Sequence, residues 1–264
     1  CPCILLQLIA TGKPLSTAGM MIEDRTRTYT IAMERTVVPE NFSFRMTDEE
    51  YRVLEKIKNS IPVCYLADHA DFALGIVTGN NKKFLSAEKT ENSEMVLKGT
   101  DICKYHINPV KQYLRFEPEQ FQQVAPLEIY RAPEKLLYRF ISNQLVVAYD
   151  DRQMLSLNSC NIVIPKIDGM QIKYILAILN SSVSQFVYQK EFHSIKVLRA
   201  HMEHIPIPRV GKAIQNEIIA MTEPLICGMG KEAAETCQKR LDCRIMDLFR
   251  LSAEEQWIIR HALH

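Results

Sequence analysis

The chain has 264 residues, of which 47% are hydrophobic and 24% are charged, and its formal net charge at neutral pH is +1. These proportions are ordinary for a globular protein that buries a substantial core. They exclude a polycationic chain, so any surface that binds nucleic acid must collect its positive charge on one face.

The first segment, CPCILLQLIA, is apolar, but it is too short to span a bilayer and lacks the basic leader of a signal peptide. It is typical of a buried strand that begins abruptly, so we expect the chain to be a piece of a longer protein. The eight cysteines show no metal-ligand spacing apart from the pair Cys1 and Cys3. We interpret them as reduced, mostly packed thiols of a cytoplasmic protein with no membrane partner.

The N-terminal third predicts strands, one helix and a hairpin. Residues 1–45 predict two or three strands, most clearly CILLQLIA and RTYTIAM. Residues 47–60 predict an amphipathic helix, because Thr47 can cap it and apolar residues recur at helical spacing. ADFALGIVTGNNKKFL, residues 70–85, predicts a hairpin that turns at Gly79-Asn80-Asn81, since these residue types accept a positive φ.

The remaining segments alternate between helix and strand patterns. APEKLLYRFISN, residues 132–143, predicts a helix with Pro133 in its first turn, and LVVAYDDRQML predicts a second hairpin that turns at Asp150-Asp151. CNIVIP predicts a strand. Residues 169–191 carry one long apolar stripe and predict the longest helix. Residues 212–263 predict helices broken near 228–230 and 251–252. The expected fold class is therefore mixed α+β, with a mainly antiparallel sheet, a long packed helix and a helical C-terminal tail.

The sequence presents no convincing catalytic or metal site. Residues 228–233 satisfy G-x-G-x-x-A, but no strand precedes them to form a nucleotide fold, so a helix break is the better interpretation. His201-Met202-Glu203-His204 lacks the spacing of a protease zinc motif. No acidic-x-Lys pair of a magnesium nuclease and no G-x-S-x-G elbow is present. We therefore predict no catalytic residue and no metal ligand in this chain.

Three stretches together indicate a family. They are GIVTGNNKKFLS at 75–86, EIYRAPEKLLYRFISNQLVVAYDDRQMLSLNSCNIVIP at 128–165, and KYILAILNSSVSQFVYQKEFHSIKVLRAHMEHIPIP at 173–208. In this order and spacing they resemble the C-terminal specificity domain of TaqI-type adenine DNA methyltransferases. The same domain occurs in fused restriction-modification enzymes, and it is similar to the target-recognition domains of type I specificity subunits. The resemblance is strong over residues 60–210.

The resemblance implies a division of the chain into three parts, and it implies that catalysis belongs to a different domain from DNA recognition. Residues 1–45 would be the last strands of a catalytic domain or a linker, 46–210 the target-recognition domain, and 211–264 a C-terminal helical segment. The glycine-rich loop that binds S-adenosylmethionine and the Asn-Pro-Pro-aromatic motif of the family are both absent. We therefore expect no cofactor in this chain, and we expect S-adenosylmethionine in a catalytic methyltransferase domain of the same polypeptide. Double-stranded DNA is the expected partner, and whether the parent protein also cleaves DNA stays open.

Nine residues are the expected DNA contacts. Lysine and arginine can anchor phosphates, and arginine and asparagine can also read base edges in the major groove. The Gly-Asn turn followed by two lysines would suit a probe for a groove, although a solvated hairpin is the structural alternative. Lys135 and Arg139 would share a helical face. The complete set is Asn80, Asn81, Lys82, Lys83, Lys135, Arg139, Arg152, Lys196 and Arg199.

Two function classes follow. The first is a DNA recognition module of an adenine-specific methyltransferase in a restriction-modification system, which a basic face around 80–83 and 135–152 would favour. The second is a subunit-interaction or scaffold module, which a continuous exposed apolar stripe on residues 212–263 would favour.

Overall fold

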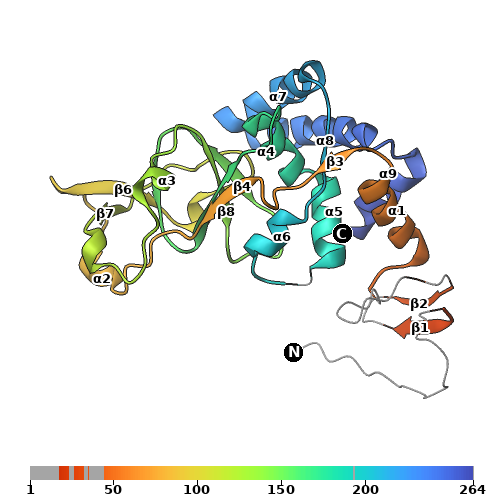
Figure 1. Ribbon diagram of the computed structural model, residues 1–264, viewed down its shortest axis with the longest axis horizontal. Helices are drawn as coiled ribbons and strands as arrows, with labels where there is room; N and C mark the ends of the chain where they lie inside the picture. The colour runs from red at the N-terminus through yellow and green to blue at the C-terminus, as the bar shows by residue number, and fades with distance from the viewer. Residues whose placement is uncertain (1–17, 24–26, 33–34, 36–44, 193, 264) are drawn as a thin grey trace. The chain divides into compact units, whose positions relative to one another are not determined.

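The computed structural model (Figure 1) describes residues 18–23, 27–32, 35, 45–192 and 194–263. The chain divides into two compact units, residues 1–52 and 53–264. The larger unit combines mainly antiparallel sheets with packed helices, which confirms the predicted mixed α+β class. The boundaries at residues 45 and 210 that the family resemblance implies stay predictions.

The described part of the smaller unit contains a β-ribbon. Strand β1 (Met20–Glu23) pairs antiparallel with β2 (Thr28–Ile31), so the RTYTIAM strand is confirmed, whereas CILLQLIA lies outside the described residues. Helix α1 (Asp48–Asn59) begins as predicted at Thr47, whose hydroxyl accepts a hydrogen bond from Glu50 N at 3.2 Å while the Glu50 carboxylate accepts one from Thr47 N at 2.9 Å. This reciprocal cap satisfies two backbone donors that a helix start leaves unpaired.

The larger unit is built on a four-stranded antiparallel sheet in the order β4-β11-β8-β9. Its strands are β4 (Ala70–Ala73), β8 (Lys135–Arg139), β9 (Val147–Asp150) and β11 (Cys160–Pro165). The strand expected at CNIVIP is confirmed. The helix predicted at 132–143 is wrong, because this segment forms β8 in the interior of the sheet. Leu136, Leu137 and Tyr138 are buried on both faces of that strand, and such a short apolar run does not distinguish a strand from a helix.

A second sheet, in the order β10-β6-β7-β5, lies at one end of the larger unit (Figure 1). It contains β5 (Leu85–Ser86), β6 (Ser93–Leu97), β7 (Tyr113–Arg115) and β10 (Leu155–Ser156), with α2 (Asn81–Phe84) and α3 (Leu127–Tyr130) beside it. Both predicted hairpins are wrong, since β4 pairs with β11 and β9 with β8, whereas β5 pairs with β7 and β10 with β6. The chain crosses between the two sheets four times, at 74–84, 116–134, 151–154 and 157–159.

Helices follow the β4-β11-β8-β9 sheet in the chain, and the first of them packs against strands β8 and β9. The predicted long helix at 169–191 is confirmed as a helical segment, but it is divided into α4 (Ile172–Asn180) and α5 (Ser182–Glu191). Ser181 between them is extended, at ψ 159°, and its hydroxyl caps α5 by accepting a hydrogen bond from Ser184 N. Short helix α6 (Arg199–Glu203) follows, and then β12 (Ile207–Pro208) pairs with β3 (Val63–Cys64).

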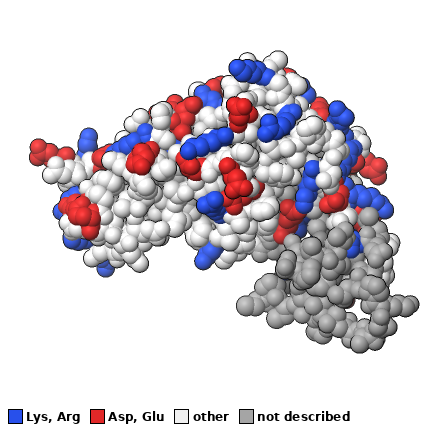
Figure 2. Space-filling view, viewed as in Figure 1, with Lys and Arg blue, Asp and Glu red and all other residues white. Residues whose placement is uncertain are grey.

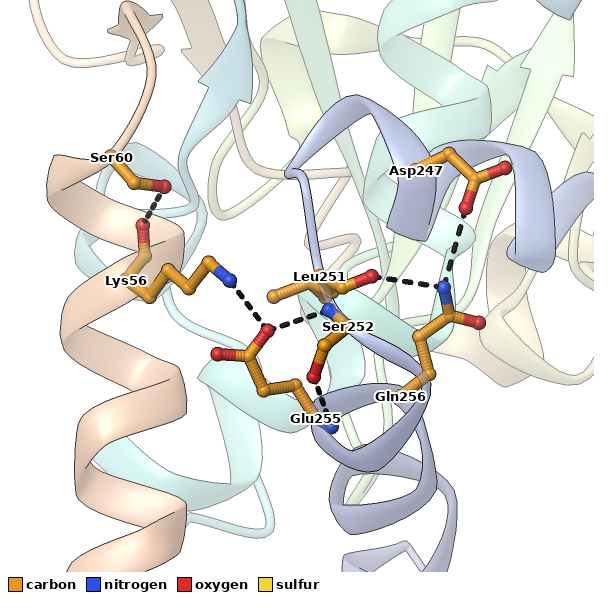
Figure 3. Close-up of polar contacts among 7 residues, drawn as sticks. All are labelled: Lys56, Ser60, Asp247, Leu251, Ser252, Glu255 and Gln256. Carbon is orange, nitrogen blue, oxygen red and sulfur yellow. Dashed lines mark hydrogen bonds and ion pairs between the residues drawn. The ribbon is translucent and has the colours of Figure 1, made fainter.

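The C-terminal residues form three helices, with both predicted breaks confirmed: α7 (Lys212–Cys227), α8 (Lys231–Leu248) and α9 (Ala253–Ala262). Ser252 and Glu255 form a reciprocal cap at the start of α9, and Lys56 of α1 pairs with the same Glu255 at 2.6 Å (Figure 3). Gln256 donates hydrogen bonds to Asp247 and to the Leu251 carbonyl, which fixes the bend between α8 and α9. No helix within the described ranges is long and apolar enough to cross a bilayer.

Candidate nucleic-acid interface

The turn that carries Asn80 to Lys83 is anchored by Phe84. The Phe84 ring is 4% exposed and packs edge-on against Phe121, with 5.1 Å between the ring centroids. Asn80 caps the four-residue helix α2, because its side-chain oxygen accepts a hydrogen bond from Lys83 N at 3.2 Å. The asparagine therefore starts a helical turn, where a hairpin was expected. This turn holds Asn80, Asn81, Lys82 and Lys83 exposed together at the surface.

Contacts around α2 fix part of this polar group. Thr78 donates a hydrogen bond to Asn81 Oδ1 at 2.6 Å, and Lys83 Nζ donates one to Gln120 Oε1 at 2.5 Å. Lys83 Nζ also lies 4.8 Å from the centre of the Phe84 ring. A third cation, Arg115, lies 5.8 Å from that ring centre, although Glu117 pairs with it at 2.7 Å. The α2 end of the larger unit thus carries several cations together with acidic side chains, of which Glu117 pairs with Arg115.

Lys196 and Arg199 form a second cationic group beside the β4-β11-β8-β9 sheet. The backbone of 195–197 runs alongside 140–142, with Val197 N donating to Phe140 O at 2.8 Å. The Arg199 guanidinium lies 5.2 Å from the centre of the Phe72 ring and pairs with Glu203 at 2.7 Å. Burial raises the pKa of nearby Tyr138 to about 12, although Asn161 and the Arg199 charge lower it.

Figure 2 shows how these two groups are related in space. The surface of the larger unit is hollowed between the end that carries α2 and the part that carries α6, and Lys and Arg side chains stand on both sides. The lining of the hollow is mostly uncharged in this view. We call this surface the α2–α6 hollow. Helix α2, which follows Asn80, lies on one side of it, and helix α6, which begins at Arg199, lies on the other.

Two of the predicted DNA contacts, Lys135 and Arg139, have their charged groups engaged in contacts within the protein. Lys135 is fully buried, pairs with Asp150 at 2.5 Å and donates a hydrogen bond to Tyr130 O at 2.6 Å. Burial lowers the pKa of Lys135, and Asp150 raises it. The guanidinium of Arg139 is half-buried and donates hydrogen bonds to the backbone carbonyls of Gly99 and Ile102. Neither side chain can reach a phosphate without breaking these contacts.

Arg152 is exposed, but no described contact joins it to either cationic group. It follows a tight turn in which the Asp150 carboxylate accepts hydrogen bonds from Arg152 N at 2.9 Å and Met154 N at 3.0 Å. The basic face expected around 135–152 is therefore not formed, and the role of Arg152 in DNA contact stays a prediction.

Sequence reasoning missed an apolar strip next to Lys196. Ile141, Ile195 and Leu198 are 54%, 72% and 42% exposed, although they are large and apolar. The antiparallel bridge between 140–142 and 195–197 pairs Ile141 with Lys196, so these two side chains lie on the same face of the paired segments. Residues 140–142 and 195–197 are far apart in the sequence and meet only in the folded chain. Periodicity along the sequence could therefore not reveal the strip. Apolar side chains can contact thymine methyl groups and sugars.

Within the described ranges, no group of three or more His, Cys, Asp and Glu residues is arranged to hold a metal ion. His201 and His204 instead pack against Phe192, at centroid distances of 4.6 Å and 6.4 Å. Burial lowers the pKa of His201, with the neighbouring His204 adding to this effect and a backbone contact opposing it.

Comparisons with known proteins identify the central part of the chain. Residues 94–207 match the family model of the TaqI-like C-terminal specificity domain, inside the range 60–210 expected from the sequence. No curated protein sequence matches the chain.

Among solved structures, the type IIL restriction-modification enzyme MmeI in complex with DNA is 10% identical, with a TM-score of 0.52, over 76% of this chain and 35% of that one. The HsdS subunit from Thermoanaerobacter tengcongensis is 15% identical, with a TM-score of 0.41, over 82% of this chain and 50% of that one. The type IIG restriction endonuclease BpuSI is 11% identical, with a TM-score of 0.41, over 77% and 33%. The chain spans half or less of the length of these three proteins, and the likeness to MmeI concerns the fold alone.

Proposed function

Since residues 94–207 form a TaqI-like C-terminal specificity domain, we propose that this chain recognises a specific sequence in double-stranded DNA for an adenine-specific methyltransferase of a restriction-modification system. The observation that carries the proposal is the α2–α6 hollow, which has exposed cations on both sides and a mostly uncharged lining. Two separated cationic groups can hold a duplex by its phosphates, while groups between them face the bases.

Each group has a distinct role in this proposal. Lys82 and Lys196 anchor phosphates through exposed ammonium groups on flexible stems, and Lys83 does so by exchanging its hydrogen bond to Gln120 for a phosphate. Asn80 and Asn81 contact base edges at the tip of the α2 turn through their side-chain NH2 groups, because their side-chain oxygens accept hydrogen bonds from Lys83 N and Thr78. Arg199 needs to exchange its contact with Glu203 for a phosphate, since that carboxylate now holds it.

The apolar strip adds a contact that is not electrostatic. Ile195 and Ile141 lie beside Lys196, so a phosphate held by Lys196 brings the neighbouring sugars and bases against them. Such contacts favour thymine through its methyl group.

In this proposal the chemistry takes place outside the described residues. A catalytic domain of the same cytoplasmic polypeptide holds S-adenosylmethionine and receives an adenine rotated out of the duplex. Rotation costs a few kcal/mol of stacking and pairing, and the free energy of duplex binding at the α2–α6 hollow offsets it. The chain itself binds, orients and selects the DNA.

Duplex DNA binding as a function of salt concentration tests the proposal. A surface that contacts several phosphates predicts retention at low salt and a logarithm of the binding constant that falls linearly with the logarithm of salt concentration. Mapping of methylated adenine in cells with and without the parent protein then identifies the recognised sequence. Equally weak binding at low and high salt, or no methylated motif that depends on the parent protein, would contradict the proposal.

A subunit-interaction role is the second candidate, and one observation favours it. Trp257 on α9 is 57% exposed and stacks on His261 at 3.8 Å between centroids. However, among the described residues of 212–263, Met229 is the other large apolar side chain with comparable exposure, so the expected continuous stripe is not formed. Trp257→Ala should abolish co-purification with a catalytic subunit if this candidate holds, and should leave DNA binding unchanged.

A further inference from the structure

The start of helix α6 lacks the usual capping side chain. Its N-cap residue is Leu198, which has no side-chain acceptor for the backbone donors of the first turn. The third residue of the helix, His201, makes a capping contact instead, because its ring nitrogen Nδ1 accepts a hydrogen bond from Leu198 N at 3.2 Å. In a capping box, glutamate or glutamine makes this contact with the N-cap backbone.

The contact needs a neutral imidazole. A backbone N–H can only donate, so Nδ1 of His201 must be unprotonated to accept from it. Burial lowers the pKa of His201, a hydrogen bond with the Lys196 backbone raises it, and the neighbouring His204 lowers it further. The net pKa lies below its usual value of 6.5, so the ring is neutral at neutral pH and available as an acceptor.

The other side of the His201 ring packs on α5. It stacks on Phe192, with 4.6 Å between the ring centroids and 22° between the planes, and its centroid lies 5.7 Å from that of Tyr188. Tyr188 is buried, and its hydroxyl donates a hydrogen bond to Ser194 O at 3.2 Å. His201 therefore joins the first turn of α6 to the C-terminal end of α5.

Arg199 depends on this turn more than Lys196 does. Arg199 is the first residue of α6, and its guanidinium lies 5.2 Å from the centre of the Phe72 ring and 2.7 Å from the Glu203 carboxylate. Lys196 is held separately, by the bridge that pairs it with Ile141. Loss of the cap would therefore displace Arg199 and leave Lys196 in place.

We propose that His201 is a positioning residue for DNA contact, which holds the first turn of α6 so that Arg199 reaches a phosphate. The inference rests on the proposed function, because it assumes that the α2–α6 hollow binds a duplex. His201 acts through its hydrogen bond to Leu198 N, and the volume of its ring is secondary.

Two variants separate the hydrogen bond from the packing. His201→Phe keeps a ring against Phe192 but removes the acceptor, whereas His201→Gln removes the ring but keeps an acceptor that reaches the N-cap backbone. His204→Phe is the matched control at the other end of α6, where the His204 ring nitrogen lies 2.7 Å from the Ala200 carbonyl oxygen. Duplex DNA of mixed sequence is the probe, titrated at several salt concentrations, and thermal unfolding checks that each variant is folded.

His201→Phe should weaken duplex binding at low salt by about fivefold, the effect of a lost helix cap. It should also lower the slope of log K against log salt by about 0.9, the share of one phosphate contact. His201→Gln and His204→Phe should bind within about twofold of the unmodified chain. Because His201 acts through Arg199, adding His201→Phe to Arg199→Gln should cause no further loss.

Unchanged binding in His201→Phe, an equal loss in His201→Gln, or additive losses in the double variant would overturn this inference and leave the proposed function standing. Binding by the unmodified chain that does not depend on salt would overturn the proposed function and this inference with it. If His201→Phe does not fold, His201→Leu takes its place. Failure of both to fold would assign His201 to the stability of the fold and overturn the positioning role.

Discussion

The ammonium group of Lys135 lies 2.5 Å from the carboxylate of Asp150, and neither side chain is accessible to solvent. The two residues are directly opposite each other on β8 and β9, so the pair is set by the strand register. Asp150 also accepts two backbone hydrogen bonds from the turn that follows β9. The Lys135–Asp150 pair thus joins β8 to β9, and Asp150 also holds the turn that follows β9.

Lys135→Met should lower the free energy of unfolding by about 3–5 kcal/mol, because it leaves the Asp150 carboxylate buried without its counter-ion. The double variant Lys135→Met/Asp150→Asn should lose less than the single one. The measurement is equilibrium unfolding in denaturant. Lys166→Met is the control, since it breaks an exposed pair with Asp71 that should contribute less than about 1 kcal/mol. Equal losses in the two single variants would contradict a structural role for the buried pair.

The double variant Lys82→Gln/Lys83→Gln should reduce the salt dependence of duplex binding. Each lost phosphate contact should lower the slope of log K against log salt by about 0.9, so two contacts remove roughly two units. Binding titrations at several salt concentrations measure this slope. Lys212→Gln/Lys231→Gln makes the same change in net charge at the starts of α7 and α8. A similar slope in both double variants would show that the α2 turn does not contact phosphates.

Gly75→Ala should destabilise the larger unit by about 1–3 kcal/mol or more, because a Cβ atom would lie 2.0 Å from the Leu157 carbonyl oxygen. This neighbour is backbone at the crossing between the two sheets and cannot move like the end of a flexible side chain. Gly211→Ala is the matched change, since a Cβ atom there meets nothing within 4 Å. It should cost less than about 1 kcal/mol in denaturant unfolding. Similar losses in the two variants would argue against the close packing at Gly75.

Stability should fall in acid partly through Glu255. Burial raises the pKa of Glu255, but contacts with Lys56 and Ser252 outweigh it, so the net pKa lies below its usual value of 4.5. A carboxyl group with a lowered folded-state pKa contributes stability that is fully present above the unfolded-state pKa. That contribution is lost as the pH falls through the folded-state pKa.

Glu255→Gln should therefore show a smaller loss of unfolding free energy than the unmodified chain when the pH is lowered through this range. Denaturant unfolding at neutral and acid pH measures the difference. Glu254→Gln removes the same charge from the same helical turn but takes no part in the contacts of Figure 3. An identical pH dependence in the unmodified chain and Glu255→Gln would contradict the assigned role.

The helices that sequence reasoning placed correctly are those with local signals. Thr47 and Ser252 each accept a hydrogen bond from the backbone three residues on, and both starts could be read from neighbouring residues alone. The segment 132–143 failed for the opposite reason. It is a strand because it pairs with β9 and β11, and the sequence does not indicate these pairings. Its lysine, Lys135, is neutralised by Asp150 on β9.

The candidate site was predictable to the extent that its residues are neighbours in sequence. The α2 turn was found because Asn80 to Lys83 are consecutive and polar, even though the turn proved to be a capped helix. Arg139 was assigned to the surface because nothing in the sequence indicates that the carbonyls of Gly99 and Ile102 surround it. The apolar strip needed the pairing of 140–142 with 195–197, which is a tertiary contact.

The pairing of β4 with β11 and of β3 with β12 has a practical consequence for transferring this part of the chain to another protein. A graft that started at residue 94 would carry β11 with β8 but without β4, and so open a hydrogen-bonding edge that invites aggregation. The transferred segment must instead include both β3 and β12, which pair with each other. Its ends therefore belong before residue 63 and after residue 208. Recombination at those two positions would transfer the α2–α6 hollow with each strand of β3 to β12 still paired with its partner.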